Sequence, residues 1–177
     1  MFIGREGEQP AKKVYPVLQA WVESRDARQA VWHAGQILRA AKLFPLSQLK
    51  DFYAMVVYHA CLVLWTYGVI NRTKLRAQPE LLSTQISLEL FLDGPESMES
   101  QRFIAVGGGT SRLKGPRNQD GTSSTASLED PKECMELGLE ILEENFNCDR
   151  QLLPAIIASL SHLLKRLGSA AVAVESM

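Results

Sequence analysis

Histidine is the residue type of this chain best suited to bind a metal or to transfer a proton. The three histidines stand alone in the sequence: His33, His59 and His162. No H-E-x-x-H pair occurs, and no cysteine lies at ligand spacing from a histidine, so the sequence predicts no metal site. We predict that His33 and His59 are core histidines bonded to neighbouring groups. His162 falls on the polar side of its helix, where we predict that it is solvated.

The cysteines are odd in number and widely spaced: Cys61, Cys134 and Cys148. They form no C-x-x-C pair and no recognisable disulfide framework. This pattern predicts reduced thiols in an intracellular compartment.

The string Gly107-Gly-Gly-Thr-Ser is the nearest approach to a phosphate-binding loop. It lacks the lysine of a P-loop and the third glycine of a dinucleotide fingerprint, and no clear strand precedes it. We interpret these glycines as linker residues. Three basic residues earlier in the chain form only a weak phosphate footprint, because no aromatic platform accompanies them: Arg72, Lys74 and Arg76.

Paired carboxylates could perform acid–base catalysis, but they occur only as Glu143-Glu144 and Glu129-Asp130. Both pairs fit solvated helix positions or helix caps better. No G-x-S-x-G nucleophile elbow occurs. We therefore expect a protein that is not an enzyme, with no catalytic, cofactor-binding or metal residues and no cofactor.

The uncharged stretch Phe52–Ile70 decides between two classes of protein. Its nineteen residues carry no formal charge, and as a helix they would reach about 28 Å, close to the hydrocarbon thickness of a bilayer. His59 and Thr66 lie inside the stretch, and its aromatic residues are spread along it rather than gathered at two interfaces. We predict a buried core helix and keep a membrane span as the alternative.

Composition agrees with one domain of ordinary hydrophobic content. The chain has 177 residues, of which 46% are hydrophobic, and a net charge of −1. A chain of this length can bury about 70% of its unfolded surface. The near-zero charge produces no overall field for nucleic acid or an anionic membrane.

An amphipathic helix is predicted over 26–43, because apolar residues recur there at three- and four-residue steps. Pro45 ends it, and Ser47 can cap the next helix, which runs through the uncharged stretch to Gly68. One face of that helix carries small residues seven apart: Ala54, Cys61 and Gly68. We expect this face to pack against the 26–43 helix in an antiparallel hairpin.

The second half of the chain predicts shorter elements. The pattern of residues 80–92 is compatible with a helix or an extended segment. Residues 96–106 predict a short helix. The Gly-, Ser- and Thr-rich residues 107–127 predict a flexible loop. Asp130-Pro131 marks a helix start, and a last helix over about 152–167 ends at Gly168. The expected fold class is all-α: an irregular helical domain with a buried central helix and a flexible Gly/Ser-rich loop.

Several strings resemble the regulatory domain of fungus-specific transcription factors. They are Val31-Trp-His-Ala-Gly-Gln-Ile-Leu-Arg-Ala-Ala, Leu49-Lys-Asp-Phe-Tyr-Ala and Val57-Tyr-His-Ala-Cys-Leu-Val-Leu-Trp-Thr-Tyr-Gly68, with further matches at Leu92-Asp-Gly-Pro-Glu, Arg102-Phe-Ile, Leu153-Pro154 and Leu163-Leu-Lys-Arg-Leu-Gly168. The resemblance is to the C-terminal part of that domain in Cys2His2 zinc-finger factors, and more distantly in binuclear zinc-cluster factors. It covers roughly 26–168, so that 1–25 is an N-terminal extension and 169–177 a tail.

This resemblance implies an all-helical, non-catalytic nuclear module of a fungal RNA polymerase II transcription factor. Its partners would be other proteins of the transcription machinery or the upstream part of the same factor. In the family, zinc and DNA are bound by a module N-terminal to this domain, and no trace of its Cys/His spacing is present here. We therefore expect zinc, and contact with DNA, only in full-length relatives, and no membrane. The alternative is a small integral membrane protein anchored by Phe52–Ile70.

Overall fold

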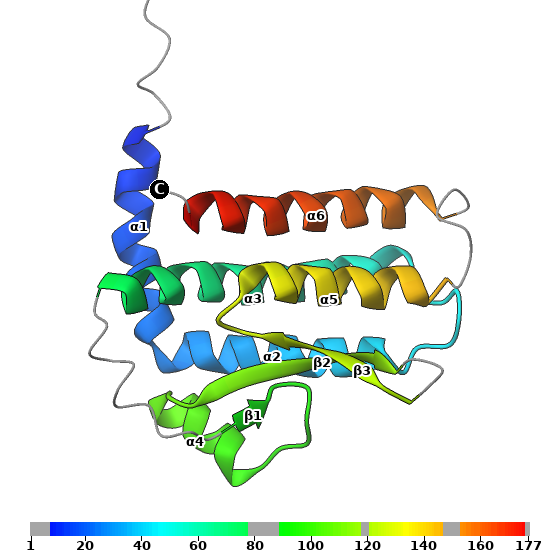
Figure 1. Cartoon of the computed structure of the whole chain (residues 1–177), viewed down its shortest axis with the longest axis horizontal. Coiled ribbons are helices and arrows are strands. Elements are labelled where there is room, and N and C mark those ends of the chain that lie inside the picture. Colours follow the sequence, from blue (N-terminus) through cyan, green and yellow to red (C-terminus); the bar gives the residue numbers. More distant parts are fainter. Residues whose placement is uncertain (1–7, 78–88, 118–120, 147–152, 176–177) are drawn as a thin grey trace, which may run out of the picture.

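The computed structural model describes residues 8–77, 89–117, 121–146 and 153–175, and the side chains within 14–173 of these ranges. Helices dominate the described residues, and a small sheet accompanies them (Figure 1). The elements in chain order are α1 (Glu8–Glu23), α2 (Arg25–Ala41), α3 (Asp51–Ala77), β1 (Glu89–Phe91), α4 (Met98–Val106), β2 (Thr110–Arg117), β3 (Ser123–Ser127), α5 (Pro131–Glu144) and α6 (Ala155–Glu175). The predicted all-α class is confirmed in that the fold is predominantly helical.

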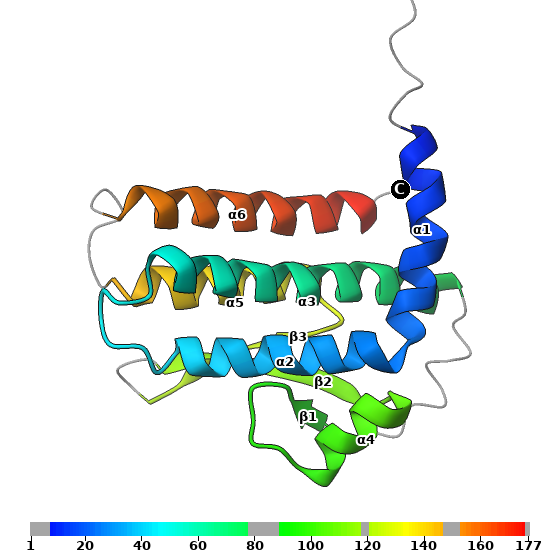
Figure 2. The same cartoon turned by 180° about the vertical axis from the view of Figure 1, so that it is seen from behind.

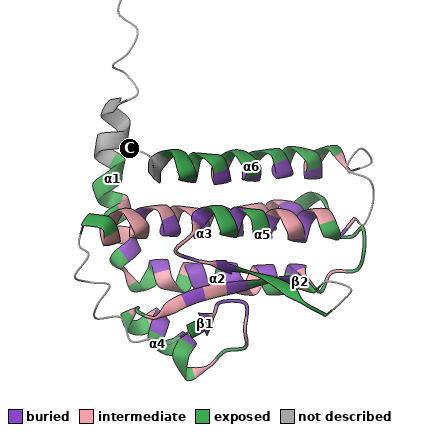
Figure 3. Ribbon diagram, in the orientation of Figure 1, coloured by how far each residue is buried: buried purple, intermediate pink, exposed green. Residues whose placement is uncertain are grey.

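Helix α3 lies at the centre, in contact with α1, α2, α5 and α6. Helices α2 and α3 run antiparallel, α6 covers α3 and α5 on one side, and α1 stands across their ends (Figures 1 and 2). The buried positions of α6 lie on the side that faces α3 and α5 (Figure 3). The apolar core is therefore built around α3 from Ala54 to Ile70, whereas Phe52 and Tyr53, at the start of the predicted core stretch, are exposed.

Capping side chains fix where several helices begin. The Ser24 hydroxyl accepts a hydrogen bond from the Ala27 N–H at 3.0 Å at the start of α2. Asp130 accepts from the Lys132 and Glu133 N–H groups at the start of α5, so the predicted cap of that helix is confirmed. Such caps satisfy N–H groups that have no partner within the helix.

The small-residue face of α3 contacts a different helix from the one predicted. The Cys61 sulfur lies against Gly138 of α5, so closely that a β-carbon on Gly138 would overlap it. Gly68 lies against the Leu128 carbonyl and Pro131 at the start of α5. The predicted α2–α3 hairpin does form. Helix α2 packs against another side of α3, because apolar residues extend around α3. The small-residue face can therefore contact α5.

The described part of 107–127 contains two strands, β2 and β3, so the predicted flexible loop is wrong there. β2 pairs in parallel with β1 and antiparallel with β3, giving the order β1–β2–β3. Leu113 and Ala126 point into the core from neighbouring strands, with exposures of 0% and 2%. The ladder hydrogen bonds and these two side chains stabilise a segment that looks too polar to fold by itself. Residues 118–120 lie outside the described residues.

Helix ends also differ from the prediction. Ser47 does not cap α3: it lies in a turn with φ of 61°, and α3 runs from Asp51 to Ala77, past Gly68. Gly168 does not end α6, which continues to Glu175. At Gly68 the Leu128 carbonyl lies so close to the backbone that a β-carbon would overlap it, which explains a glycine inside the helix. The segment 1–25, which the family resemblance leaves as an N-terminal extension, contains α1.

Candidate functional site

A groove of about 650 Å³ lies where α2, the β2–β3 hairpin and the end of α5 meet. Its apolar wall comes from the last turn of α2, the chain that follows it, and α5: Ala41, Leu43, Phe44, Leu46 and Ile141. The charged lining residues are Lys42, Asp93, Lys114, Arg117 and Glu144. A volume of this size is in the range of ligand-binding sites.

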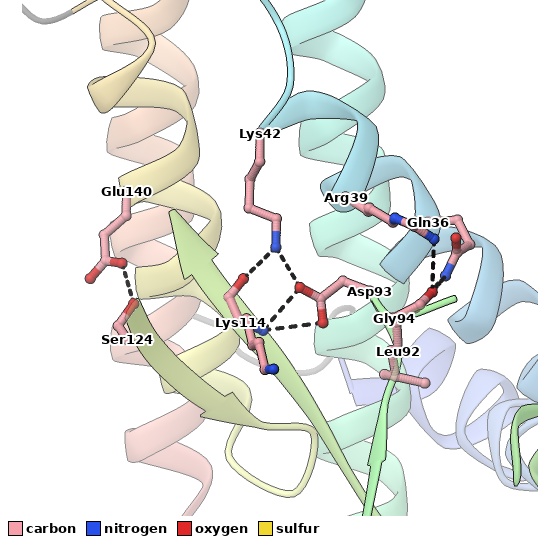
Figure 4. A network of polar contacts seen from close by, with 9 residues as sticks. All are labelled: Gln36, Arg39, Lys42, Leu92, Asp93, Gly94, Lys114, Ser124 and Glu140. Carbon is pink, nitrogen blue, oxygen red and sulfur yellow. Dashed lines mark hydrogen bonds and ion pairs between the residues drawn. The ribbon is translucent and has the colours of Figure 1, made fainter. Parts of the chain in front are cut away.

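Asp93 holds the wall of the groove together (Figure 4). Its carboxylate pairs with the Lys42 ammonium and accepts hydrogen bonds from the Lys114 N–H at 3.1 and 3.2 Å. The Lys42 ammonium also donates to the Lys114 carbonyl at 2.7 Å. The Asp93 side chain is 3% exposed and that of Lys42 16% exposed. This buried pair therefore joins the C-terminal end of α2 to the sheet.

A second set of contacts holds α2 to the chain that follows β1 (Figure 4). The Gln36 amide donates to the Leu92 carbonyl at 2.8 Å and to the Gly94 carbonyl at 2.9 Å. Gly35 lies directly on the Leu92 backbone, where any β-carbon would overlap it. Glycine at this position lets the two backbones approach closely enough for the Gln36 hydrogen bonds to form.

Asn145, just after α5, fixes the turn that carries the apolar wall. Its side-chain oxygen accepts from the Leu49 N–H at 2.9 Å, and its amide nitrogen donates to the Phe44 and Pro45 carbonyls at 3.3 and 3.0 Å. The Asn145 carbonyl accepts from the Ser47 N–H at 2.7 Å. Asn145, far away in the sequence, therefore joins the turn between α2 and α3 to the end of α5, in addition to the hydrogen bonds within the turn itself.

Large apolar side chains around this turn are exposed to solvent. Leu43 is 80% exposed, Leu46 65%, Phe52 72% and Tyr53 52%. The Phe44 ring, on the groove wall, lies 4.9 Å from the Tyr53 ring, which in turn lies 5.9 Å from the Phe52 ring. We call these five residues the turn patch. A contiguous exposed apolar surface of this kind is typical of interaction sites.

The exposed charges along the groove differ between its two sides. On the β2 side the Lys114 ammonium lies 4.2 Å from the centre of the Phe91 ring, and Arg117 donates to the Gly121 carbonyl at 3.4 Å. On the α5 side is Glu144, whose pKa is raised by partial burial and, to a lesser degree, by the nearby Glu140 carboxylate. The groove therefore combines an apolar surface with cations on one side, an arrangement that suits binding of a ligand with apolar and anionic groups.

The prediction that His33 and His59 are core residues is wrong. His33 is exposed, with the Gln29 amide 3.5 Å from its ring. His59 is also exposed, and its Nδ1 lies 2.7 Å from the Met55 carbonyl on its own helix. Both therefore lie on the exposed sides of their helices among the residues that the structure describes. His162 is exposed, as predicted. Among the described residues no three His, Cys, Asp or Glu side chains gather in a way that could hold a metal ion.

The other candidate residues have structural roles where they are described. Gly107, Gly108 and Gly109 have φ values of 75°, 85° and 82°, which other residues rarely adopt, and they turn the chain from α4 into β2. Glu143 pairs with Lys165 at 3.4 Å, and Lys74 with Glu23 at 2.6 Å. Cys61 and Cys134 are buried free thiols, whereas Cys148 lies outside the described residues.

Sequence reasoning missed the residues that shape the groove, above all Asp93 and Asn145. In the sequence, Asp93 stands within one of the family-like strings, directly before Gly94-Pro95, and this turn-forming pair is the only local signal beside it. Arg28 of α2 is a further residue without a sequence signal. Its guanidinium donates to the Ile104 and Ala105 carbonyls at 3.1 and 3.0 Å and so caps the end of α4.

No protein-family model matches the chain, and no curated protein or solved structure matches it. Its function must therefore be inferred from its own residues.

Proposed function

We propose that this chain is a non-catalytic regulatory module of a fungal RNA polymerase II transcription factor. It acts in the nucleus through contacts with other proteins, either of the transcription machinery or of the same factor. Zinc and DNA are bound by a separate zinc-binding module of the full-length factor.

The observation that carries this proposal is that the family-like strings contact one another. In the string that begins at Val31, Gly35 and Gln36 lie against Leu92 and Gly94 of a second string. In the string that ends at Gly68, the Trp65 indole donates to the Leu167 carbonyl of another at 2.9 Å. If the strings resembled the family by chance, we would expect them to lie scattered over the molecule. Strings that define a shared fold should instead contact one another in its core.

The turn patch and the groove support the protein-contact part of the proposal. They combine exposed apolar side chains with charged residues that line the groove, a composition found in protein interfaces. Protein contacts at such a surface are the means by which a non-catalytic module could act.

The proposal is tested by tethering the chain to a DNA-binding domain of unrelated origin upstream of a reporter gene in a fungal cell. We expect transcription to rise or fall relative to the DNA-binding domain alone. Gly35→Leu, which cannot pack against Leu92, should abolish the effect, and Gly168→Ala should preserve it because its neighbours leave room for a methyl group. A reporter level equal to that of the DNA-binding domain alone would contradict the proposal.

Membrane anchoring is the second candidate, favoured by one specific observation. α3 is long and apolar enough to cross a membrane, and 44% of its most apolar window is buried within the protein. A sodium carbonate wash of the membrane fraction distinguishes the two. We expect the full chain to be released into the wash, and retention in the pellet would favour the anchor.

A further inference from the structure

We propose that the groove and the turn patch together form a docking site for an acidic amphipathic segment of a partner protein. This inference names a partner class for the protein-contact role proposed above and rests on that role. It concerns the surface formed by the turn between α2 and α3, by β2 and by the end of α5.

The extent of the apolar surface favours a polypeptide segment over a small ligand. Phe44 lines the groove, but its ring continues the surface outward to Tyr53 and Phe52, which do not line it. A small molecule seated in the groove would leave these exposed rings uncovered. An amphipathic helix or extended segment can place one apolar side chain in the groove and others along the turn patch.

Charge complementarity favours an acidic segment. Of the five charged lining residues, Asp93 and Lys42 neutralise each other, and the Asp93 carboxylate also accepts a hydrogen bond from the Lys114 N–H. Lys114 and Arg117 are the exposed cations, and both belong to β2. Glu144, on α5, is the exposed anion of the lining. The carboxylates of the partner should therefore face β2, while its neutral or basic residues face α5, which also sets its orientation.

The surface is held in shape before any partner binds. Asn145 pins the turn through hydrogen bonds to Leu49, Phe44 and Pro45. Lys114 rests on the Phe91 ring, and Arg117 bonds the Gly121 carbonyl. Binding therefore requires little ordering of the docking site, and this lowers its entropic penalty.

The test is a selection of random displayed peptides on the full chain, followed by affinity measurement of the enriched peptides as synthetic probes. We expect peptides with several Asp or Glu residues and at least two large apolar residues. Arg117→Glu and Leu46→Ser should each weaken binding by about tenfold, and Glu144→Lys should strengthen it. All three residues are exposed, so the variants should fold, which their thermal melting curves would check. Arg166→Glu, on the exposed face of α6, is the matched charge control and should bind like the wild type.

Enrichment of basic peptides, of no peptides, or of peptides insensitive to Arg117→Glu and Leu46→Ser would overturn the inference. So would binding to phosphatidylserine vesicles that Leu46→Ser abolishes, because the patch would then face a membrane. The selection contains no transcription readout. A failed selection beside an active tethered module would overturn this site alone, and peptide binding beside an inactive module would overturn the transcriptional role alone.

Discussion

At the scale of single residues, Asp93 contributes most to the candidate site. Its buried carboxylate is shared between the Lys42 side chain and the Lys114 main chain, so it joins a helix to a strand. Removing one charge of a buried pair leaves the other without its partner, which usually destabilises a protein more than the pair itself stabilises it.

We expect Asp93→Asn to lower the free energy of unfolding by about 2 kcal/mol, because the Lys42 ammonium loses its counter-charge while remaining mostly buried. Urea denaturation measures this change. Glu136→Gln is the matched control, because the Lys132–Glu136 pair at 3.6 Å is more than half exposed on both sides. It should change the free energy by less than about 0.5 kcal/mol. Equal effects of the two variants would contradict the role assigned to Asp93.

The two buried thiols make stability depend on pH in alkaline solution. Burial raises the pKa of the Cys61 thiol from 9.0 to about 12, and burial, with smaller contributions from neighbouring negative charges, also raises the pKa of Cys134. Above pH 9 the unfolded thiols lose their protons while the folded thiols keep them. The stability present below pH 9 should therefore fall by about 1.4 kcal/mol per pH unit for each thiol as the pH approaches 12.

The measurement is the slope of the unfolding free energy against pH between 9 and 11, for the wild type and for Cys61→Ala. We expect the variant to have the shallower slope by the amount due to one thiol. Comparing slopes removes any constant loss of stability from the substitution. Identical slopes would show that the Cys61 thiol ionises as readily in the folded protein as in the unfolded chain.

At the scale of elements, the crossing of α3 and α5 depends on the absence of a side chain at Gly138. The Cys61 sulfur occupies the space that a β-carbon would need. This contact sets how closely the central helix approaches the helix that carries Glu144 and Asn145 of the candidate site.

We expect Gly138→Ala to destabilise the protein by about 1–3 kcal/mol, because the added methyl group overlaps the Cys61 sulfur. Adding Cys61→Ala should recover part of this loss, because it removes the overlapping atom. Thermal and urea unfolding of the single and double variants measure both effects. Purely additive losses in the double variant would contradict the contact.

Gly168→Ala is a control for Gly138→Ala, because it should raise the free energy of unfolding rather than lower it. Gly168 lies within α6, and a β-carbon there would meet Met135 and Lys132 at 3.6 and 3.7 Å, ordinary packing distances. Alanine is the better helix former, so we expect an increase in unfolding free energy of about 0.5–1 kcal/mol. A decrease would indicate that α6 does not continue past this residue.

The helices could be predicted from sequence more fully than the sheet. The apolar repeats of α2 and the Asp130 cap of α5 are local signals, and both elements form as expected. The strands β2 and β3 carry few apolar residues, and Leu113 is buried only because β1, β3 and the helices surround it. Pairing between distant segments leaves little trace in local composition.

The candidate site was beyond the reach of sequence reasoning for the same physical reason. Asp93 and Lys42 meet only after α2 and the sheet have packed, and Asn145 reaches a turn about a hundred residues earlier in the chain. The small-residue face of α3 was identified correctly, but its partner could not be chosen, because several helices offered apolar surfaces. Only the fold decides that α5 contacts it.

At the scale of the whole molecule, both the fold and the proposed function require that α3 is the core helix of a folded protein. Helices α1, α2, α5 and α6 contact it, and its buried residues include Val57, Leu64 and Ile70. Residues at the centre of a cooperative core open only when the whole molecule unfolds.

Hydrogen exchange of the full chain in detergent-free buffer, read by mass spectrometry, tests this claim most directly. We expect amides of α3 between Ala54 and Ile70 to exchange slowest, with a free energy of opening equal to that of global unfolding measured by urea. Gly138→Ala should lower both by the same amount. Fast exchange of α3 in the folded protein, or slow exchange seen only after insertion into lipid or detergent, would contradict the account.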